Sequence, residues 1–112
     1  MINPAELLAA ISRRGGLASG VPCSGLASII SLLDRLPDWR HLPAPNEAVA
    51  VATACGGAFL GRPALAYMQN SGVGYAIDAL ASLGAPYGIP VHLVVSHRGE
   101  PKAERLPQHE VL

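Results

Sequence analysis

Glu47 is the first candidate for chemistry in this 112-residue chain, because it is a lone carboxylate at the head of a long apolar segment. It follows Asn46 and precedes small or apolar residues as far as Leu60, which is typical of a capped helix. An acid in the first turn then has a purely structural role, since it complements the helix dipole. A carboxylate desolvated where this helix meets a second protein body would instead suit a group that shares a proton with a ligand nitrogen.

Three other polar segments interrupt the apolar sequence, and each follows a stretch that favours a β-strand. They are residues 22–24 (Pro-Cys-Ser), 69–72 (Gln-Asn-Ser-Gly) and 96–99 (Ser-His-Arg-Gly). Strands that alternate with helices predict a parallel sheet, and the carboxyl ends of its strands meet at one edge. Ligands bind at that edge in folds of this class, so we expect these segments to gather there around Glu47.

The hydrophobic pattern predicts the elements that position these segments. Helices are expected over residues 4–14, 26–36, 46–60 and 71–83. Their expected N-terminal caps are Asn3, Ser24, Asn46 and Ser71. Strands are expected over residues 17–21, 39–42, 64–68 and 91–95. Residues 1–112 therefore predict a single α/β domain, a Rossmann-like parallel sheet with helices on both faces.

The composition argues against several classes of function. The formal charge is zero and the basic residues are scattered, so neither a nucleic-acid partner nor an anionic membrane surface is expected. No apolar run reaches the roughly 20 residues of a membrane-spanning helix, and the N-terminal segment is unlike a signal peptide. Cys23 and Cys55 lack the spacing of a metal site, so we expect two thiols in a cytoplasmic protein without metal ligands of its own.

Two common motifs fail in detail near Gly72. The sequence Gly72-Val73-Gly74 is followed by Ile77, where a dinucleotide-binding loop requires glycine or alanine. Ser71 lacks the flanking glycines of a hydrolase nucleophile elbow. Neither a dinucleotide-binding enzyme nor a hydrolase of that class is therefore expected.

Several motifs together resemble one family. The motifs are Asn46-Glu47, Met68-Gln69-Asn70-Ser71-Gly72, His97-Arg98-Gly99-Glu100 and Pro107-Gln108-His109. They are similar to the pyrimidine-binding domain of thiamine-diphosphate-dependent decarboxylases, in the branch of phosphonopyruvate decarboxylase and the alpha subunit of sulfopyruvate decarboxylase. Cys23 favours the sulfopyruvate side and the Pro45-Asn46-Glu47 sequence the phosphonopyruvate side, so the choice between these two anionic substrates stays open.

The resemblance implies thiamine diphosphate as the cofactor and non-oxidative decarboxylation of a 3-anionic 2-oxo acid to the aldehyde. Glu47 is implied to bind the pyrimidine ring nitrogen, where a carboxyl group favours the imino tautomer needed for proton transfer. The implied catalytic residues are Glu47 and His109. The implied cofactor-binding residues are Glu47, Gln69, Asn70, Ser71 and Gly72. The implied substrate-binding residues are Pro22, Cys23, Ser24, Asn70 and Arg98. Arg98 has an equally good alternative role as a structural ion-pair partner.

The same resemblance implies a partner. Members of this family hold the diphosphate and its Mg²⁺ with a second domain that carries a Gly-Asp-Gly signature, and this sequence has none. A pyrophosphate-binding subunit in a separate chain is therefore implied, unless the sequence is a fragment, together with self-association through this domain. Two other functions stay open: a non-catalytic pairing or regulatory subunit of the same lineage, and a carboligase of the acetolactate synthase type.

Overall fold

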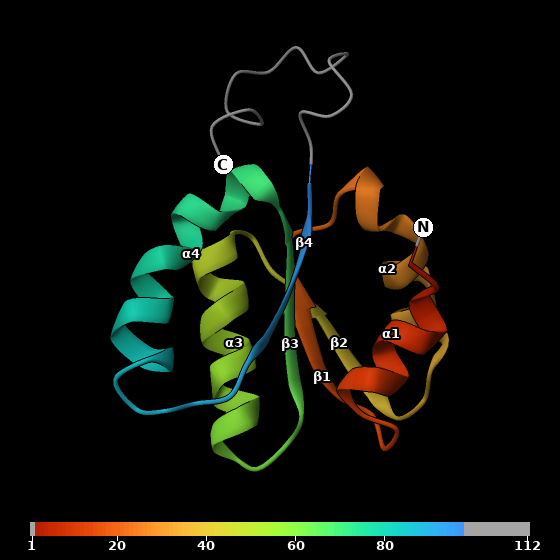
Figure 1. Ribbon diagram of the computed structural model, residues 1–112, viewed down its shortest axis with the longest axis horizontal. Helices are drawn as coiled ribbons and strands as arrows, with labels where there is room; N and C mark the ends of the chain where they lie inside the picture. Colours follow the sequence, from red (N-terminus) through yellow and green to blue (C-terminus); the bar gives the residue numbers. More distant parts are fainter. Residues whose placement is uncertain (1, 98–112) are drawn as a thin grey trace.

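The computed structural model describes residues 2–97, which form a four-stranded parallel sheet between helices (Figure 1). The sheet has the order β2-β1-β3-β4, and every neighbouring pair is parallel. The strands are β1 (Gly16–Gly20), β2 (Trp39–Pro43), β3 (Ala64–Gln69) and β4 (His92–Ser96). The α-helices are α1 (Pro4–Ile11), α2 (Ala27–Arg35), α3 (Glu47–Phe59) and α4 (Val73–Ala79). The predicted α/β class is confirmed.

Three short turns complete the described chain. The 3-10 turns η1 (Ser24–Leu26) and η2 (Asn70–Gly72) follow β1 and β3 and lead into α2 and α4. A π-helical turn, η3 (Leu80–Gly84), follows α4. None of the helices within residues 2–97 is long and apolar enough to cross a membrane.

Two hydrophobic cores lie on opposite faces of the sheet. Helices α1 and α2 cover one face, and α3 and α4 cover the other (Figure 1). The core under α1 and α2 contains Leu8, Ala18, Leu26, Ile29, Leu33, Trp39, Leu65 and Tyr67. The core under α3 and α4 contains Val51, Ala54, Cys55, Ala64, Ala66, Met68, Ala76 and Ala79. The second core consists largely of alanine, which allows α3 to lie close to the central strands.

The central strand β3 is buried on both faces, as its continuous apolar run predicts. Residues 64–68 are all buried, and successive side chains enter alternate cores because side chains alternate along a strand. Neighbouring β1 has small residues, which leave room for the large ones of β3. A Cβ at Gly20 would collide with the Tyr67 ring, so glycine at this position lets the ring lie across the backbone of β1.

The edge strand β4 is much more exposed than the central strands β1 and β3. Its residues are exposed or half-buried throughout, and Leu93 and Val95 leave 39% and 40% of their surfaces accessible. β4 pairs only with β3 among the described strands. The apolar sequence of β4 therefore marks a strand, but one whose outer side is uncovered in the described part of the chain.

The expected helix ends and caps need correction. Helix α4 ends at Ala79 rather than Leu83, because residues 80–84 form the π-helical turn η3. Helix α1 ends at Ile11 rather than near residue 14, because Ser12 adopts an extended backbone and donates its hydroxyl proton to the Gly15 carbonyl. Ser24 and Ser71 are not helix caps. Each lies inside a 3-10 turn, and neither α2 nor α4 has a side-chain cap.

Candidate functional site

The carboxyl ends of the four strands bring the predicted polar segments to one edge of the molecule (upper edge in Figure 1). The register pairs Gly20 with Pro43 and Tyr67, and Gln69 with Ser96. The segments that follow these strand ends are residues 21–26, 44–47, 70–72 and 97. The sheet topology thus confirms that these segments share an edge.

Glu47 is the first residue of α3 and lies directly against the turn that follows β3. The Asn46 side chain caps α3 by accepting a hydrogen bond of 3.0 Å from the Val49 N–H. A Cβ at Gly72 would lie 2.6 Å from both Cγ and Cδ of Glu47, so the Glu47 side chain fills the space that a side chain at position 72 would need. Glycine at position 72 is therefore what lets the carboxylate sit against the turn.

The Glu47 carboxylate has no partner in the described part of the protein. It is half-buried, and no hydrogen bond or ion pair engages it within residues 2–97. A partly buried carboxylate loses hydration without a compensating contact, which favours binding of a donor from outside. This arrangement goes beyond the structural role of an acid in the first turn of a helix.

The turn after β3 is built by its own side chains. The Gln69 Nε2 donates a hydrogen bond of 2.7 Å to the Ser71 Oγ. Asn70 is 2% exposed and has an interaction partner, and Gly72 is buried against Glu47. The turn is therefore held by its own hydrogen bond, and it contacts the Glu47 side chain through Gly72.

The segment after β1 forms a second wall of this edge. Pro22 and Ser24 are exposed, and Cys23 is half-buried. Together with one face of α2 they line an open groove of about 530 Å³, formed by Pro22, Cys23, Ser24, Ala27, Ile30, Ser31 and Asp34. Gly25 packs directly on the Ser96 side chain, so this segment is also in contact with the end of β4.

Two predicted site residues, Arg98 and His109, lie outside the described residues. His97 is the last described residue, and it is exposed. The carboxyl edge described here thus contains Glu47, the turn over residues 69–72 and the segment over residues 22–24. No group of three or more His, Cys, Asp or Glu side chains that could hold a metal ion occurs among residues 2–97.

A chain of hydrogen bonds behind this edge was not predicted from the sequence. His41 on β2 contacts Asp34 through Nδ1 at 2.5 Å and the Tyr67 hydroxyl through Nε2 at 2.6 Å. Because a carboxylate only accepts, the His41 Nδ1–H donates to Asp34. In the tautomer protonated at Nδ1 alone, Nε2 accepts the Tyr67 hydroxyl proton. The His41 side chain is 4% exposed and the Asp34 side chain 63%, so the chain leads from the surface into the core.

Burial raises the pKa of two residues, Tyr67 in this hydrogen-bonded chain and Cys55 in the core on the other face of the sheet. Desolvation, with smaller contributions from Asp34 and Cys23, raises the pKa of Tyr67 from 10 to about 12, so its hydroxyl stays a proton donor at neutral pH. Burial also raises the pKa of the Cys55 thiol above its usual value. Both cysteines are free, and Cys55 is the less reactive kind, a protonated thiol inside a core.

No protein-family model matches the chain. The known proteins that resemble it are decarboxylases. The chain is 38% identical over 82 residues to sulfopyruvate decarboxylase subunit alpha of Methanothermobacter thermautotrophicus, covering 73% of this chain and 50% of that protein. It is 39% identical over 85 residues to the same subunit of Methanococcus maripaludis, covering 75% of this chain and 50% of that protein.

A second group of relatives matches the whole chain. Phosphonopyruvate decarboxylase of Streptomyces viridochromogenes is 35% identical over 113 residues, which cover 100% of this chain and 28% of that protein. The chain spans about half the length of the alpha subunits that it matches. The chain is thus related to the sulfopyruvate and phosphonopyruvate decarboxylases, the branch that its sequence motifs predict.

Proposed function

We propose that this chain is the pyrimidine-binding part of a thiamine-diphosphate-dependent decarboxylase that converts sulfopyruvate or phosphonopyruvate to the corresponding aldehyde. The observation that carries the proposal is the half-buried Glu47 carboxylate, held against Gly72 and without a partner among residues 2–97. The names of the relatives support a decarboxylase. When bound, the cofactor would accept the electrons released as carbon dioxide leaves the 2-oxo acid.

Glu47 would bind the pyrimidine ring nitrogen and exchange a proton with it. The Glu47 carboxylate suits a pyrimidine ring nitrogen, because it is partly desolvated and lies in the first turn of α3. A carboxyl group held in place beside a ligand nitrogen can pass a proton to it directly, which is what general acid–base catalysis requires.

Gln69, Asn70, Ser71 and Gly72 would orient the cofactor and the substrate beside Glu47. The Gln69–Ser71 hydrogen bond and the burial of Asn70 support this role, because both fix the turn before a ligand arrives. A preformed site loses less conformational entropy when it binds.

Pro22, Cys23 and Ser24 would contact the 2-oxo acid from the other side of the edge. Their position beside the groove on α2 supports a substrate-binding role. Arg98 would attract the sulfonate or phosphonate group, and His109 would transfer a proton or contact the substrate. Both assignments remain predictions from the sequence motifs.

A second subunit would supply the Mg²⁺ and the diphosphate contacts. The relatives named subunit alpha imply a partner in those enzymes. In this chain, an apolar stripe on α3 is suited to such a partner, because it begins two residues after Glu47 and is exposed. It comprises Val49, Ala52, Gly56 and Phe59. Self-association through the same domain is the other predicted contact.

The test is reconstitution with a candidate pyrophosphate-binding subunit, thiamine diphosphate and Mg²⁺. We expect release of carbon dioxide from sulfopyruvate or phosphonopyruvate and formation of an aldehyde. Glu47→Gln should lower kcat at least about 100-fold, since general acid–base groups contribute factors of this size. The matched control is Glu6→Gln, which changes an exposed acid in the first turn of the Asn-capped helix α1 and should leave kcat unchanged.

The outcomes separate the competing functions. Equal activity of Glu47→Gln and the unaltered protein would refute the catalytic role of Glu47. A complex that forms but consumes neither acid would identify a pairing or regulatory subunit. A carbon–carbon coupled acid in place of the aldehyde would identify a carboligase.

A further inference from the structure

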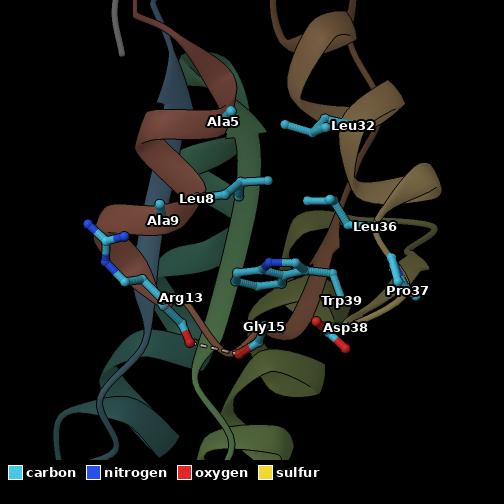
Figure 2. Close-up of a pocket in the computed structure, with 11 residues that line it drawn as sticks. Ala5, Leu8, Ala9, Arg13, Gly15, Leu32, Leu36, Pro37, Asp38 and Trp39 are labelled. Carbon is cyan, nitrogen blue, oxygen red and sulfur yellow. Dashed lines mark hydrogen bonds between the residues drawn. The ribbon is translucent and has the colours of Figure 1, made fainter.

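A pocket between α1 and α2 lies on the side of the sheet away from Glu47 and α3. Its cavity of about 290 Å³ is lined by Ala5, Leu8, Ala9, Ser12, Arg13, Gly15, Leu32, Leu36, Pro37, Asp38 and Trp39 (Figure 2). Trp39 begins β2, so the pocket is at the amino ends of the strands, opposite the edge that holds Glu47. It is therefore separate from the proposed catalytic site.

Trp39 is a buried residue whose indole N–H has no protein partner within residues 2–97. Trp39 is 7% exposed, and within residues 2–97 no acceptor forms a hydrogen bond with its Nε1–H. In Figure 2 the nitrogen-bearing edge of the ring faces the gap between Leu8 and Leu36, inside the pocket. Native proteins rarely leave a buried N–H unpaired, because the lost hydration costs about 1–3 kcal/mol.

Apart from the exposed Arg13 and Asp38, the polar side chain that lines the pocket with Trp39 is that of Ser12. The Ser12 hydroxyl is already engaged, since it donates to the Gly15 carbonyl at 2.9 Å and accepts from the Arg14 N–H at 3.2 Å. A buried water needs two to four polar partners, and the indole nitrogen has leucine side chains around it. A molecule with an apolar body and one acceptor atom matches these surroundings better.

The charges at the pocket favour a neutral ligand. Arg13 and Asp38 are both exposed and have opposite signs, so the lining has no net preference for anions or cations. The remaining lining side chains are mostly aliphatic. The volume is near the lower limit of about 300 Å³ for ligand pockets, which restricts the ligand to a small molecule.

We propose that this pocket binds a small, neutral, mainly apolar molecule whose carbonyl oxygen accepts the Trp39 indole N–H. The apolar body lies between the Leu8 side chain of α1 and the Leu36 side chain at the end of α2. The site would be occupied independently of the chemistry at Glu47. The proposal of this ligand site therefore does not depend on whether the decarboxylase activity is found.

Trp39 is the single tryptophan of the chain, so its indole reports directly on this pocket. The experiment titrates the full chain with cyclohexanone, a compact apolar ketone, and records the indole ¹H–¹⁵N resonance together with tryptophan fluorescence. We expect a saturable downfield shift of the indole proton and a shift of the emission to shorter wavelength. Nuclear Overhauser contacts between the probe and the methyl groups of Leu8 and Leu36 should accompany them.

Two alanine variants of α1 give the matched comparison. Ala9 lines the pocket, whereas Ala10 is exposed and does not, so Ala9→Leu should fill the cavity and Ala10→Leu should leave it open. We expect the response to cyclohexanone to weaken at least tenfold in Ala9→Leu and to persist in Ala10→Leu. Both variants keep a helix-favouring residue, and unaltered circular dichroism confirms that each is folded.

Three results would overturn the proposal. One is the absence of a saturable response in the folded, unaltered protein. Another is an equal response in Ala9→Leu and Ala10→Leu, which would place the probe elsewhere. The third is a long-lived bound water that contacts the indole proton and is not displaced by the probe.

Discussion

At the scale of single residues, the site depends on a contact between a carboxylate and a glycine from different segments. Glu47 begins α3 and Gly72 ends η2, and the missing side chain at position 72 creates the space that the carboxylate occupies. The position of Glu47 is thus set by a residue that has no chemistry of its own. A small change at Gly72 tests this dependence without touching any polar atom.

Gly72→Ala is expected to displace the Glu47 side chain, because the added Cβ would lie 2.6 Å from its Cγ and Cδ. We predict at least a tenfold loss of decarboxylase activity in the reconstituted complex, measured as release of carbon dioxide. The control is Gly84→Ala, since an added Cβ there meets only Leu80 Cδ2, at 4.0 Å, and Gly84 belongs to neither the site nor the exposed stripe of α3. This control should keep its activity. Full activity of Gly72→Ala would contradict the importance of this contact.

The hydrogen-bonded chain of Asp34, His41 and Tyr67 should contribute to stability. Tyr67→Phe removes the hydroxyl that bonds to His41 and leaves the buried Nε2 unpaired. We predict a loss of about 1–3 kcal/mol in the free energy of unfolding, measured by urea denaturation at pH 7. Tyr75→Phe, which alters an exposed tyrosine, should cost less than 0.5 kcal/mol, about the effect of an ordinary surface substitution.

Tyr67 also makes the stability depend on pH, in a direction that its pKa defines. Its pKa is raised from 10 in the unfolded chain to about 12 in the folded protein, so the folded state retains the proton longer. The stabilising contribution of Tyr67 is therefore complete below pH 10 and is lost as the pH rises to 12. Denaturation at several pH values should show the advantage of the unaltered protein over Tyr67→Phe shrinking across this interval. A constant difference would refute the shift.

The sequence was sufficient to predict one of these two groups of residues. Glu47 and residues 69–72 could be placed together because each follows a predicted parallel strand, and such strand ends share an edge. The contact between His41 and Tyr67 could not be predicted, because β2 and β3 are not neighbours in the sheet. Their rings meet across β1 only because Ala18 and Gly20 are small, and that depends on strand order and register.

At the scale of elements, α3 is the helix on which the candidate site is built. It has a good cap at Asn46, an apolar face in the core and the exposed apolar stripe of Val49, Ala52, Gly56 and Phe59. The sequence predicted this helix to within one residue at each end, since the cap and the final glycine are both strong signals. The prediction that Ser24 and Ser71 cap helices was wrong, because serine also favours 3-10 turns, where its hydroxyl bonds to neighbouring side chains or to solvent.

Asn46→Ala should loosen the first turn of α3 and with it Glu47. Loss of the bond to the Val49 N–H is expected to cost about 1 kcal/mol of stability and to reduce kcat in the reconstituted complex. Asn3→Ala removes the equivalent cap of α1, whose side chain accepts from Ala5 and Glu6, and should cost a similar stability. Because α1 is remote from Glu47, the Asn3 variant should keep its kcat. Equal kcat values for Asn46→Ala and Asn3→Ala would show that the Asn46 cap does not affect catalysis.

At the scale of the whole molecule, the two faces differ in how completely they are covered. An apolar pocket of about 340 Å³ opens on the outer side of α3 and is lined by Ala52, Cys55, Gly56, Phe59, Leu83, Tyr87 and Ile89. Phe59 and Tyr87 leave 76% and 72% of their surfaces exposed. Large exposed aromatic residues around a pocket are typical of a surface that another protein covers.

Ala52→Glu should weaken assembly with the partner subunit. The substitution places a charge in the apolar pocket, and burial of that charge in an interface is unfavourable. We predict at least a tenfold higher Kd by analytical ultracentrifugation with unchanged folding of the isolated chain. Ala10→Glu makes the same change at an exposed position of α1, on the other face of the sheet, and should leave Kd unaltered. If both variants assemble normally, the partner binds another surface.

The strand order has a consequence for biosynthesis. Of the four described strands β1 leaves the ribosome first, yet it lies between β2 and β3, and β3 follows only after α2, β2 and α3 have been made. One side of β1 must therefore stay unpaired during much of translation, and bare strand edges readily capture other chains. The nascent polypeptide is most vulnerable to aggregation in this interval, when a chaperone would be of greatest use.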